Sequence, residues 1–300
     1  MMTVKKIGFV GLGAMGLPMA RNLAKSQYSV RGYDIRPNAA ATLIEVGGEA
    51  AESAAAACSG ADAAMLMVVN LHQAESVLFE AGALEALAPG AVVIVSATCP
   101  PDGVVELAKR VEATGRLFVD APVSGGVVGA ESGSLTIMAS GSDGALELAM
   151  PVLNKVGGKI VRVGDQPGQG ATAKAVNQLM CGAHIAVAAE ALSLAEKLGL
   201  DMAAMFDIVS GSAASSWMLK DRGPRMLIDD APVMSAVDIF VKDLGIVLEA
   251  GRGAKTALPI AALAHQLFLS VSGRGLGGLD DSQVILAYRS LQGRDGGRDE

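Results

Sequence analysis

The residue with the clearest capacity for chemistry is a lysine in apolar surroundings. Lys174 is flanked in the sequence by four apolar residues, Ala171, Ala173, Ala175 and Val176. A lysine on a solvated helix face would have polar neighbours, so this setting favours a functional role. The protonated amine could polarise a carbonyl group and donate a proton, and the neutral amine could accept one from a hydroxyl group. The second role requires a lowered pKa, which burial and a nearby cation such as Lys242 could supply.

The tripeptide Ser124-Gly125-Gly126 is a second candidate. Consecutive N–H groups at glycines are not screened by side chains, so they can form a small concavity that binds an anion. The Ser124 hydroxyl would add another donor. A carboxylate would suit such a site, although a simple flexible turn would have the same sequence.

A glycine-rich turn near the N-terminus indicates a nucleotide site. The sequence Gly11-Leu12-Gly13-Ala14-Met15-Gly16 follows a strand-like run directly and precedes a helical segment. In this context the glycines allow a tight turn and close approach to a pyrophosphate, which the N–H groups at a helix N-terminus bind. Asp34 ends the next strand-like run, where a carboxylate accepts hydrogen bonds from ribose hydroxyls. A structural glycine turn in an unrelated α/β fold is the alternative.

Asp34 also bears on which dinucleotide is bound. Its carboxylate would repel a 2′-phosphate, whereas Arg36 could hold that phosphate or lie against the adenine. With a carboxylate at the key position, we expect NAD rather than NADP. Thr98 and Asn70 each follow a strand-like run, and ligands of open α/β sheets bind beyond the carboxyl ends of strands. Both are therefore expected to face the cofactor, although an ordinary loop hydrogen bond would explain either residue.

Strand-like and helical segments alternate through the first half of the chain. Short apolar runs predict strands at 6–10, 29–34, 63–69, 92–96, 117–120, 135–139 and 160–163. Helices are expected around 14–26, 38–46, 53–58, 102–114 and 143–154. Fully apolar strands suit a parallel sheet covered on both faces, so the alternation predicts an α/β fold with a doubly wound sheet.

The character of the sequence changes at the glycine-rich loop 164–170, where we place a domain boundary. One long helix is expected at about 171–198, bridging the two halves. Further helices are expected near 202–210, 234–251, 258–270 and 281–291, with no convincing strand among them. The predicted organisation is a nucleotide-binding domain at 1–164, an all-α domain at 165–292 and a disordered tail at 293–300.

Composition argues against several other classes of protein. The net charge is −7 and no basic block occurs, so nucleic-acid binding is not expected. Cys58, Cys99 and Cys181 form no CxxC pair and the three histidines are scattered, so we expect neither a disulfide framework nor a metal site. A reducing cytoplasm fits this cysteine usage. No uninterrupted apolar run of about 18 residues occurs in the sequence, so a membrane span is not expected.

The assembly state can also be anticipated. The long, largely apolar helix and the alanine-rich second half suggest more exposed apolar surface than a monomer usually carries. We therefore expect a homodimer or homotetramer. The apolar stretch at the N-terminus contains glycines and lacks a cleavage site, so it is interpreted as a buried first strand rather than a secretory signal.

Four stretches together resemble the β-hydroxyacid dehydrogenases, the family of 3-hydroxyisobutyrate, tartronate-semialdehyde and L-threonate dehydrogenases. They occur in the family's order and cover 11–23, 120–126, 168–178 and 240–244. The resemblance implies a Rossmann domain, an all-helical second domain and a catalytic site between them. It implies Lys174 as the catalytic lysine, Ser124, Gly125 and Gly126 as the substrate-carboxylate segment, and Thr98 and Lys242 as cofactor contacts.

One position departs from the family pattern. Many members have Asn four residues after the lysine, where this chain has Gln178, and Asn177 precedes it. Residues three and four apart share a helix face, so either amide could contact the substrate.

The resemblance implies oxidation of a small hydroxy acid by hydride transfer to NAD. The segments 217–219 and 233–240 look most like the L-threonate dehydrogenase branch. Reduction of tartronate or succinic semialdehyde and oxidation of 3-hydroxyisobutyrate are alternatives, because specificity depends on pocket shape. A non-catalytic nucleotide-binding module is a competing class, but such a module need not retain the proton-transferring lysine.

Overall fold

The computed structural model describes residues 3–26 and 28–293, and the chain divides into two compact units within one long helix, after Lys174. The domain boundary predicted from the sequence lies in the loop before this helix. The predicted tail falls outside the described residues, except for Gly293.

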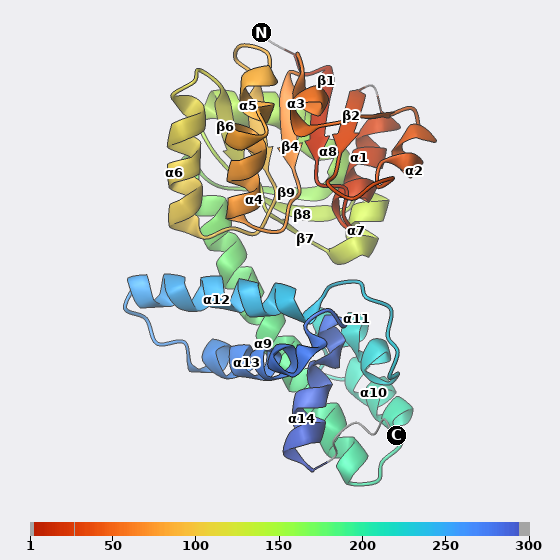
Figure 1. The fold of residues 1–300 in the computed structure, drawn as a ribbon. Coiled ribbons are helices and arrows are strands. Elements are labelled where there is room, and N and C mark those ends of the chain that lie inside the picture. The colour runs from red at the N-terminus through yellow and green to blue at the C-terminus, as the bar shows by residue number, and fades with distance from the viewer. Residues whose placement is uncertain (1–2, 27, 294–300) are drawn as a thin grey trace. The chain divides into compact units, whose positions relative to one another are not determined.

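The first unit contains a nine-stranded, mostly parallel sheet (Figure 1). In chain order its strands are β1 (Lys6–Val10), β2 (Ser29–Tyr33), β3 (Glu49–Ala50), β4 (Ala63–Leu66), β5 (Val92–Val95), β6 (Leu117–Asp120), β7 (Val123–Ser124), β8 (Leu135–Ser140) and β9 (Gly157–Gly164). The spatial order is β3-β2-β1-β4-β5-β6-β8-β7, and β9 pairs with β8. From β3 to β6 all neighbours are parallel, whereas β8 is antiparallel to β6 and β7.

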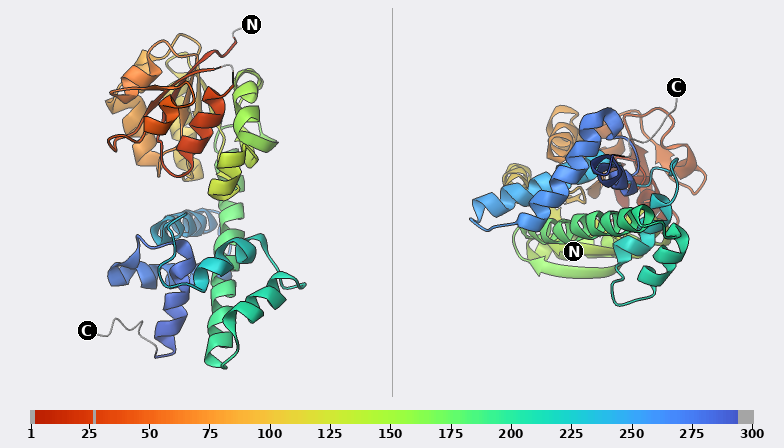
Figure 2. Two further views of the ribbon diagram at one scale, coloured as in Figure 1. Left: turned by 90° about the vertical axis from the view of Figure 1, so that its right-hand side faces the viewer. Right: turned by 90° about the horizontal axis from the view of Figure 1, so that it is seen from below.

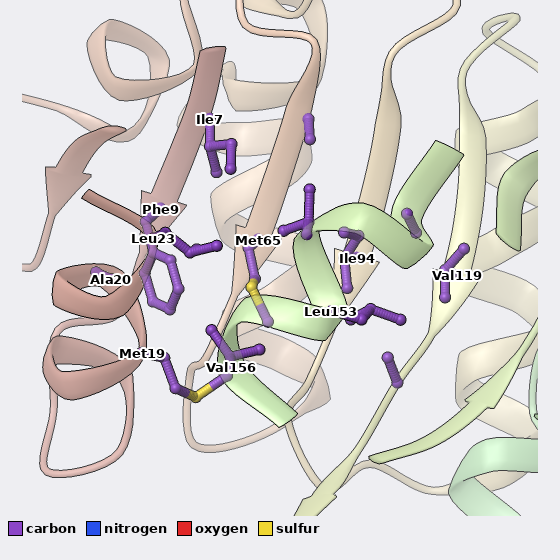
Figure 3. Close-up of a cluster of buried hydrophobic side chains, with 14 of the residues drawn as sticks. Ile7, Phe9, Met19, Ala20, Leu23, Met65, Ile94, Val119, Leu153 and Val156 are labelled. Atoms are coloured by element: carbon purple, nitrogen blue, oxygen red, sulfur yellow. The ribbon is translucent and has the colours of Figure 1, made fainter. Parts of the chain in front are cut away.

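Helices cover both faces of this sheet, as expected where central strands such as β4 and β5 are apolar throughout. They are α1 (Gly16–Ala24), α2 (Ala41–Ile44), α3 (Ala54–Cys58), α4 (Leu71–Glu75), α5 (Ala83–Ala86), α6 (Pro101–Glu112), α7 (Gly126–Ser132) and α8 (Asp143–Val156), with a π-helical turn at Ser76–Glu80. Successive side chains of the central strands alternate between two buried clusters, one on each face of the sheet. Figure 3 shows the first, in which Met19 of α1 and Leu153 of α8 pack around Phe9, Met65 and Ile94 of three neighbouring strands.

The second cluster lies on the opposite face of the sheet. Leu66 of β4 and Phe118 of β6 pack there against helices α3, α5 and α6. The α/β fold class with a parallel, helix-covered sheet is therefore confirmed, and it places the carboxyl ends of β1, β4, β5 and β6 along one edge.

The second unit is helical. Its helices are the continuation of α9 (Gln169–Lys197), α10 (Met202–Ser210), α11 (Trp217–Met226), α12 (Val237–Gly253), α13 (Pro259–Val271) and α14 (Ile285–Leu291), with a π-helical turn at Ser272–Leu276 and a 3-10 turn at Asp281–Val284. Figure 2 shows α9 as one continuous rod. Its second half forms a core in which Ile185 and Leu192 are joined by Phe240, Leu244 and Phe268.

Among the described residues, α9 is long and apolar enough to cross a membrane, and 61% of its apolar window is buried inside the molecule. The core helix of a water-soluble protein meets the same criteria of length and composition. The helix is therefore weak grounds for placing the chain in a bilayer.

A buried ion-pair cluster joins α11 to the 3-10 turn. Arg222 contacts Asp281 through two hydrogen bonds of 3.1 and 2.9 Å, and the Arg225 Nε donates to Asp280 Oδ1 at 2.9 Å. Asp221 contacts both guanidinium groups, and neither Asp280 nor Asp281 is exposed to solvent. Buried charges of this kind are tolerated because each one has a partner.

Several short elements differ from the sequence-based expectation. The helix expected around 38–46 is regular only at Ala41–Ile44, and the strand expected at 63–69 ends at Leu66. Helix α11 was not predicted, because Gly223 and Pro224 interrupt its pattern. Packing explains the glycine: a Cβ at Gly223 would collide with the Phe206 ring, so glycine allows α10 and α11 to pack closely.

Candidate functional site

The glycine turn after β1 has the geometry that a pyrophosphate site requires. Gly11 has a φ of +94°, and a Cβ there would lie 2.5 Å from the Met67 carbonyl oxygen. A Cβ at Gly16 would collide with the Gly11 carbonyl oxygen, so glycine is needed where α1 starts against the strand. At Gly13 the nearest atom to a Cβ would be the Arg36 Nη2 at 4.0 Å, so the face over this turn is open. The residues present therefore fit a dinucleotide.

Asp34 follows β2 and holds the same turn in place. Its Oδ2 accepts the Leu12 N–H at 2.7 Å, and its Oδ1 accepts the Arg36 N–H at 2.8 Å. Burial raises the pKa of Asp34, but hydrogen bonds from Arg36 and Leu12 outweigh that effect and hold the pKa below its usual range. The carboxylate is thus charged at neutral pH, as the recognition of ribose hydroxyls requires.

Arg36 spans the edge of the turn. Its Nη2 donates to the Leu12 carbonyl oxygen at 2.9 Å, and its Nε lies 3.0 Å from Asp34 Oδ1. The side chain is nevertheless 60% exposed. The guanidinium is therefore committed to Asp34 and the turn, although its exposed face can still contact an adenine or a phosphate.

Asn70 and Thr98 follow β4 and β5, at the same sheet edge as the glycine turn. Asn70 caps α4: its Oδ1 accepts the Gln73 N–H at 2.9 Å, and the Gln73 Oε1 accepts the Val69 N–H at 2.9 Å. This helix cap gives Asn70 a structural role. It corresponds to the ordinary loop hydrogen bond that the sequence offered as the alternative to a cofactor contact. Thr98 is half-buried in the loop between β5 and α6.

The Ser124-Gly125-Gly126 segment forms the entry to α7. Ser124 pairs with Thr136 of β8, and Gly125 and Gly126 have φ values of +134° and +62°. Both conformations favour glycine, and the first N–H groups of a helix have no partner within that helix. The segment is thus a sharp strand-to-helix turn with unscreened N–H groups, which is compatible with the predicted carboxylate site.

The helix that carries Lys174 begins on a buried carboxylate that the sequence analysis assigned no role. Asp120 Oδ2 accepts the Ala171 N–H at 2.7 Å and the Gly168 N–H at 3.1 Å. Ser140 Oγ accepts the Gly170 N–H at 2.9 Å. Lys174 lies one turn further along α9 and is only 6% exposed.

Three further predicted residues lie in the second unit. Gln178 Nε2 donates to Asp243 Oδ2 at 2.6 Å, and the Lys242 Nζ lies 2.7 Å from Asp243 Oδ1. Asn177 Oδ1 accepts a weak hydrogen bond from the Cys181 thiol, at 3.7 Å. The buried Asp243 therefore links α9 to α12 and orients both Gln178 and Lys242.

The predicted residues are divided between the two units. The first unit holds the glycine turn, Asp34, Asn70, Thr98, the 124–126 segment and Lys174, and the second holds Asn177, Gln178 and Lys242. Residues 174, 177 and 178 share a face of α9, because residues three and four apart on a helix are neighbours.

The chain is similar to known dehydrogenases over nearly its whole length. Residues 6–164 match the family described as the NAD-binding domain of 6-phosphogluconate dehydrogenase, and residues 168–288 match the NAD-binding region of NADP-dependent 3-hydroxyisobutyrate dehydrogenase. L-threonate dehydrogenase of Cupriavidus necator is 44% identical over 96% of this chain and 97% of its own length. The Escherichia coli K12 enzyme of the same name is 42% identical over 95% of each chain. The crystal structure of 3-hydroxyisobutyrate dehydrogenase from Salmonella typhimurium is 41% identical over 94% of this chain and 99% of that one, with a TM-score of 0.90.

Fold, nucleotide turn and relatives define an NAD-dependent dehydrogenase that acts on hydroxy acids. More particularly, the chain belongs to the 3-hydroxyisobutyrate dehydrogenase family, as the resemblance of its four motifs implied. The non-catalytic nucleotide-binding module is thereby set aside.

The buried Asp120 predicts a pH dependence of stability. Burial raises the pKa of Asp120 from 3.8 to about 6, although hydrogen bonds from Ala171, Gly168 and Ser140 act in the opposite direction. A folded-state pKa above the unfolded value stabilises the fold at low pH, and this contribution is lost as the pH rises through about 6. A shift of this size corresponds to about 3 kcal/mol.

Asp120→Asn mimics the neutral carboxyl and serves as the reference. We expect the free energy of unfolding of the wild type, relative to Asp120→Asn, to fall by up to about 3 kcal/mol between about pH 4 and about pH 7. Urea unfolding at several pH values measures it. A difference that stays flat over this range would contradict the assignment.

Proposed function

We propose that the protein oxidises the 2-hydroxyl group of L-threonate with NAD as hydride acceptor. The observation that carries the chemistry is Lys174, a buried amine one turn into a helix whose N-terminus is anchored beside the sheet edge. The choice of substrate is supported by the L-threonate dehydrogenases that match nearly the whole chain at 38–44% identity.

Each step can be assigned to residues of this chain. The N–H groups of the 124–126 segment and the Ser124 hydroxyl bind the substrate carboxylate, with Gln178 or Asn177 contacting a substrate hydroxyl. Neutral Lys174 accepts the proton of the hydroxyl that is oxidised, and as an ammonium group it returns a proton to the carbonyl in the reverse direction. Bound NAD would supply the hydride acceptor for the carbon that bears this hydroxyl.

The cofactor would be held mainly by the first unit. The turn at Gly11–Gly16 and the N-terminus of α1 bind the pyrophosphate, Asp34 binds the adenosine ribose, and Asn70 and Thr98 line the nicotinamide side. Lys242, oriented by Asp243, adds a contact from the second unit. Between the two amides of α9, Gln178 is the better candidate for the substrate side because its hydrogen bond to Asp243 fixes its orientation.

Substrate and cofactor are tested together by following NAD and NADP reduction with L-threonate, D-glycerate and 3-hydroxyisobutyrate. We expect kcat/KM for L-threonate with NAD to exceed that of the other acids by at least about tenfold. The charged Asp34 should make NADP poorer by a similar factor, about tenfold. A higher kcat/KM for 3-hydroxyisobutyrate would assign the protein to that alternative, and turnover with none of the acids would refute the proposal.

The role of Lys174 is tested by Lys174→Ala, with Lys159→Ala as an exposed lysine control in the same unit. Loss of the proton-transferring group should lower kcat by about 10²–10⁴-fold, while the NAD dissociation constant stays within about twofold. The control should keep full activity. Unchanged turnover in Lys174→Ala would remove the lysine from the mechanism.

We also propose that the protein is a cytoplasmic homodimer or homotetramer. Met180, Val187 and Leu194 of α9 are spaced seven residues apart and are 49–59% exposed, so they form one apolar stripe along the helix. The buried cysteines, with no CxxC pair, support a reducing compartment.

Val187→Glu tests the assembly, because a charge in the centre of an apolar interface is strongly unfavourable. Light scattering should give a multiple of the 30.3 kDa chain for the wild type and a clear shift toward the monomer for the variant. Leu291→Glu is a matched control, since Leu291 is 78% exposed and lies outside the stripe. A wild type that is monomeric would contradict this proposal.

A further inference from the structure

The start of α9 is pressed directly against the ends of two strands. A Cβ at Gly170 would lie 2.6 Å from the Met138 carbonyl oxygen and 2.9 Å from Asp120 Oδ2. At Gly168, where φ is +94°, it would lie 2.7 Å from Val105 Cγ2. Only glycines fit at these positions, so the first N–H groups of the helix reach two acceptors that are themselves fully buried.

These acceptors are Asp120, at the end of β6, and Ser140, at the end of β8. The two residues are paired across the sheet, and the Ser140 hydroxyl lies 3.4 Å from Asp120 Oδ2. Asp120 Oδ2 thus receives three donors, whereas its Oδ1 has no hydrogen-bond partner among residues 3–26 and 28–293. All of the donors reach Oδ2, and two of them are N–H groups at the start of α9. The carboxyl group of Asp120 therefore acts as a cap for this helix rather than as a member of a wider hydrogen-bond network.

The same residue leads into the proposed carboxylate site. The Ala121 N–H donates to the Val95 carbonyl oxygen at 2.8 Å, and the Pro122 carbonyl oxygen accepts the Met138 N–H at 3.0 Å. The chain is thereby fixed to both neighbouring strands until Ser124 pairs with Thr136. Only a short, pinned segment separates Asp120 from the 124–126 turn.

We propose that Asp120, assisted by Ser140, is the positioning residue that holds Lys174 at a fixed distance from the 124–126 backbone. The inference rests on the proposed function of those two groups. Asp120 contacts the N–H of Ala171, one turn before Lys174, and its own backbone continues into the carboxylate-binding turn. Loss of the cap therefore displaces the amine relative to the anchored acid, and small displacements of a reacting group are costly in rate.

The test compares Asp120→Ala, which removes the acceptor, with Asp120→Asn, which keeps one oxygen for the helix. We expect Asp120→Ala to lower kcat by at least about tenfold, with the NAD dissociation constant within about twofold. Hydrogen exchange at amides 168–174 should become faster in this variant. Asp120→Asn should recover kcat to within about threefold of the wild type. Unchanged kcat in Asp120→Ala, or equal loss in both variants, would overturn the proposal.

Asp201→Ala is the matched control, because Asp201 caps α10 by accepting the Ala204 N–H at 2.7 Å. It should leave kcat unchanged. If Asp120→Ala does not fold, Ser140→Ala is measured instead; faster exchange at Gly170 with a lower kcat supports the proposal, and no change in either overturns it. If the wild type oxidises no hydroxy acid, the proposed function fails, whereas the exchange data for Asp120→Ala and Asp120→Asn still decide whether Asp120 anchors α9.

Discussion

Two helices of this protein begin where their backbone touches the backbone of a strand or its turn, and both contacts exist only because glycine has no side chain. Gly16 brings α1 against the turn after β1, and Gly170 brings α9 against the ends of β6 and β8. Each contact puts the N–H groups of a helix start at one edge of the sheet. The nucleotide turn and the origin of the lysine-bearing helix therefore follow from the same steric constraint.

Much of the fold was predictable because its central strands, such as β4 and β5, are short, continuous and apolar. The strands Lys6–Val10 and Leu117–Asp120 and the helix Met202–Ser210 have the bounds that the sequence predicted. The elements that were not predicted share a cause, because tertiary contacts rather than local sequence determine whether they form. Gly223 and Pro224 disfavour a helix locally, but α11 forms because Gly223 lets it pack against Phe206. Strand β7 has only two residues, too few to show a period.

The candidate site could be proposed from the sequence only where local motifs mark it. The glycine turn, Asp34 and Lys174 were proposed from spacing and from local context, whereas Asp120, Ser140 and Asp243 were not assigned roles. Their contacts join residues far apart in the chain, such as Gln178 and Asp243, which no local pattern relates. The sequence did offer one signal for Asp120 and Asp243, because each lies within an otherwise apolar strand or helix. A carboxylate in such a place is expected to be buried and to require hydrogen-bond partners.

The ion-pair cluster at Arg222, Arg225, Asp280 and Asp281 limits how the helical unit can diverge during evolution. Exchanging one member for an apolar residue leaves the charge of its partner buried and unpaired, which destabilises the fold. Exchanging both members of a pair together avoids this cost. Lineages of this family should therefore vary these positions jointly or leave them alone. Covariation between positions 222 and 281 would therefore reflect the 2.9 Å hydrogen bond between Arg222 and Asp281.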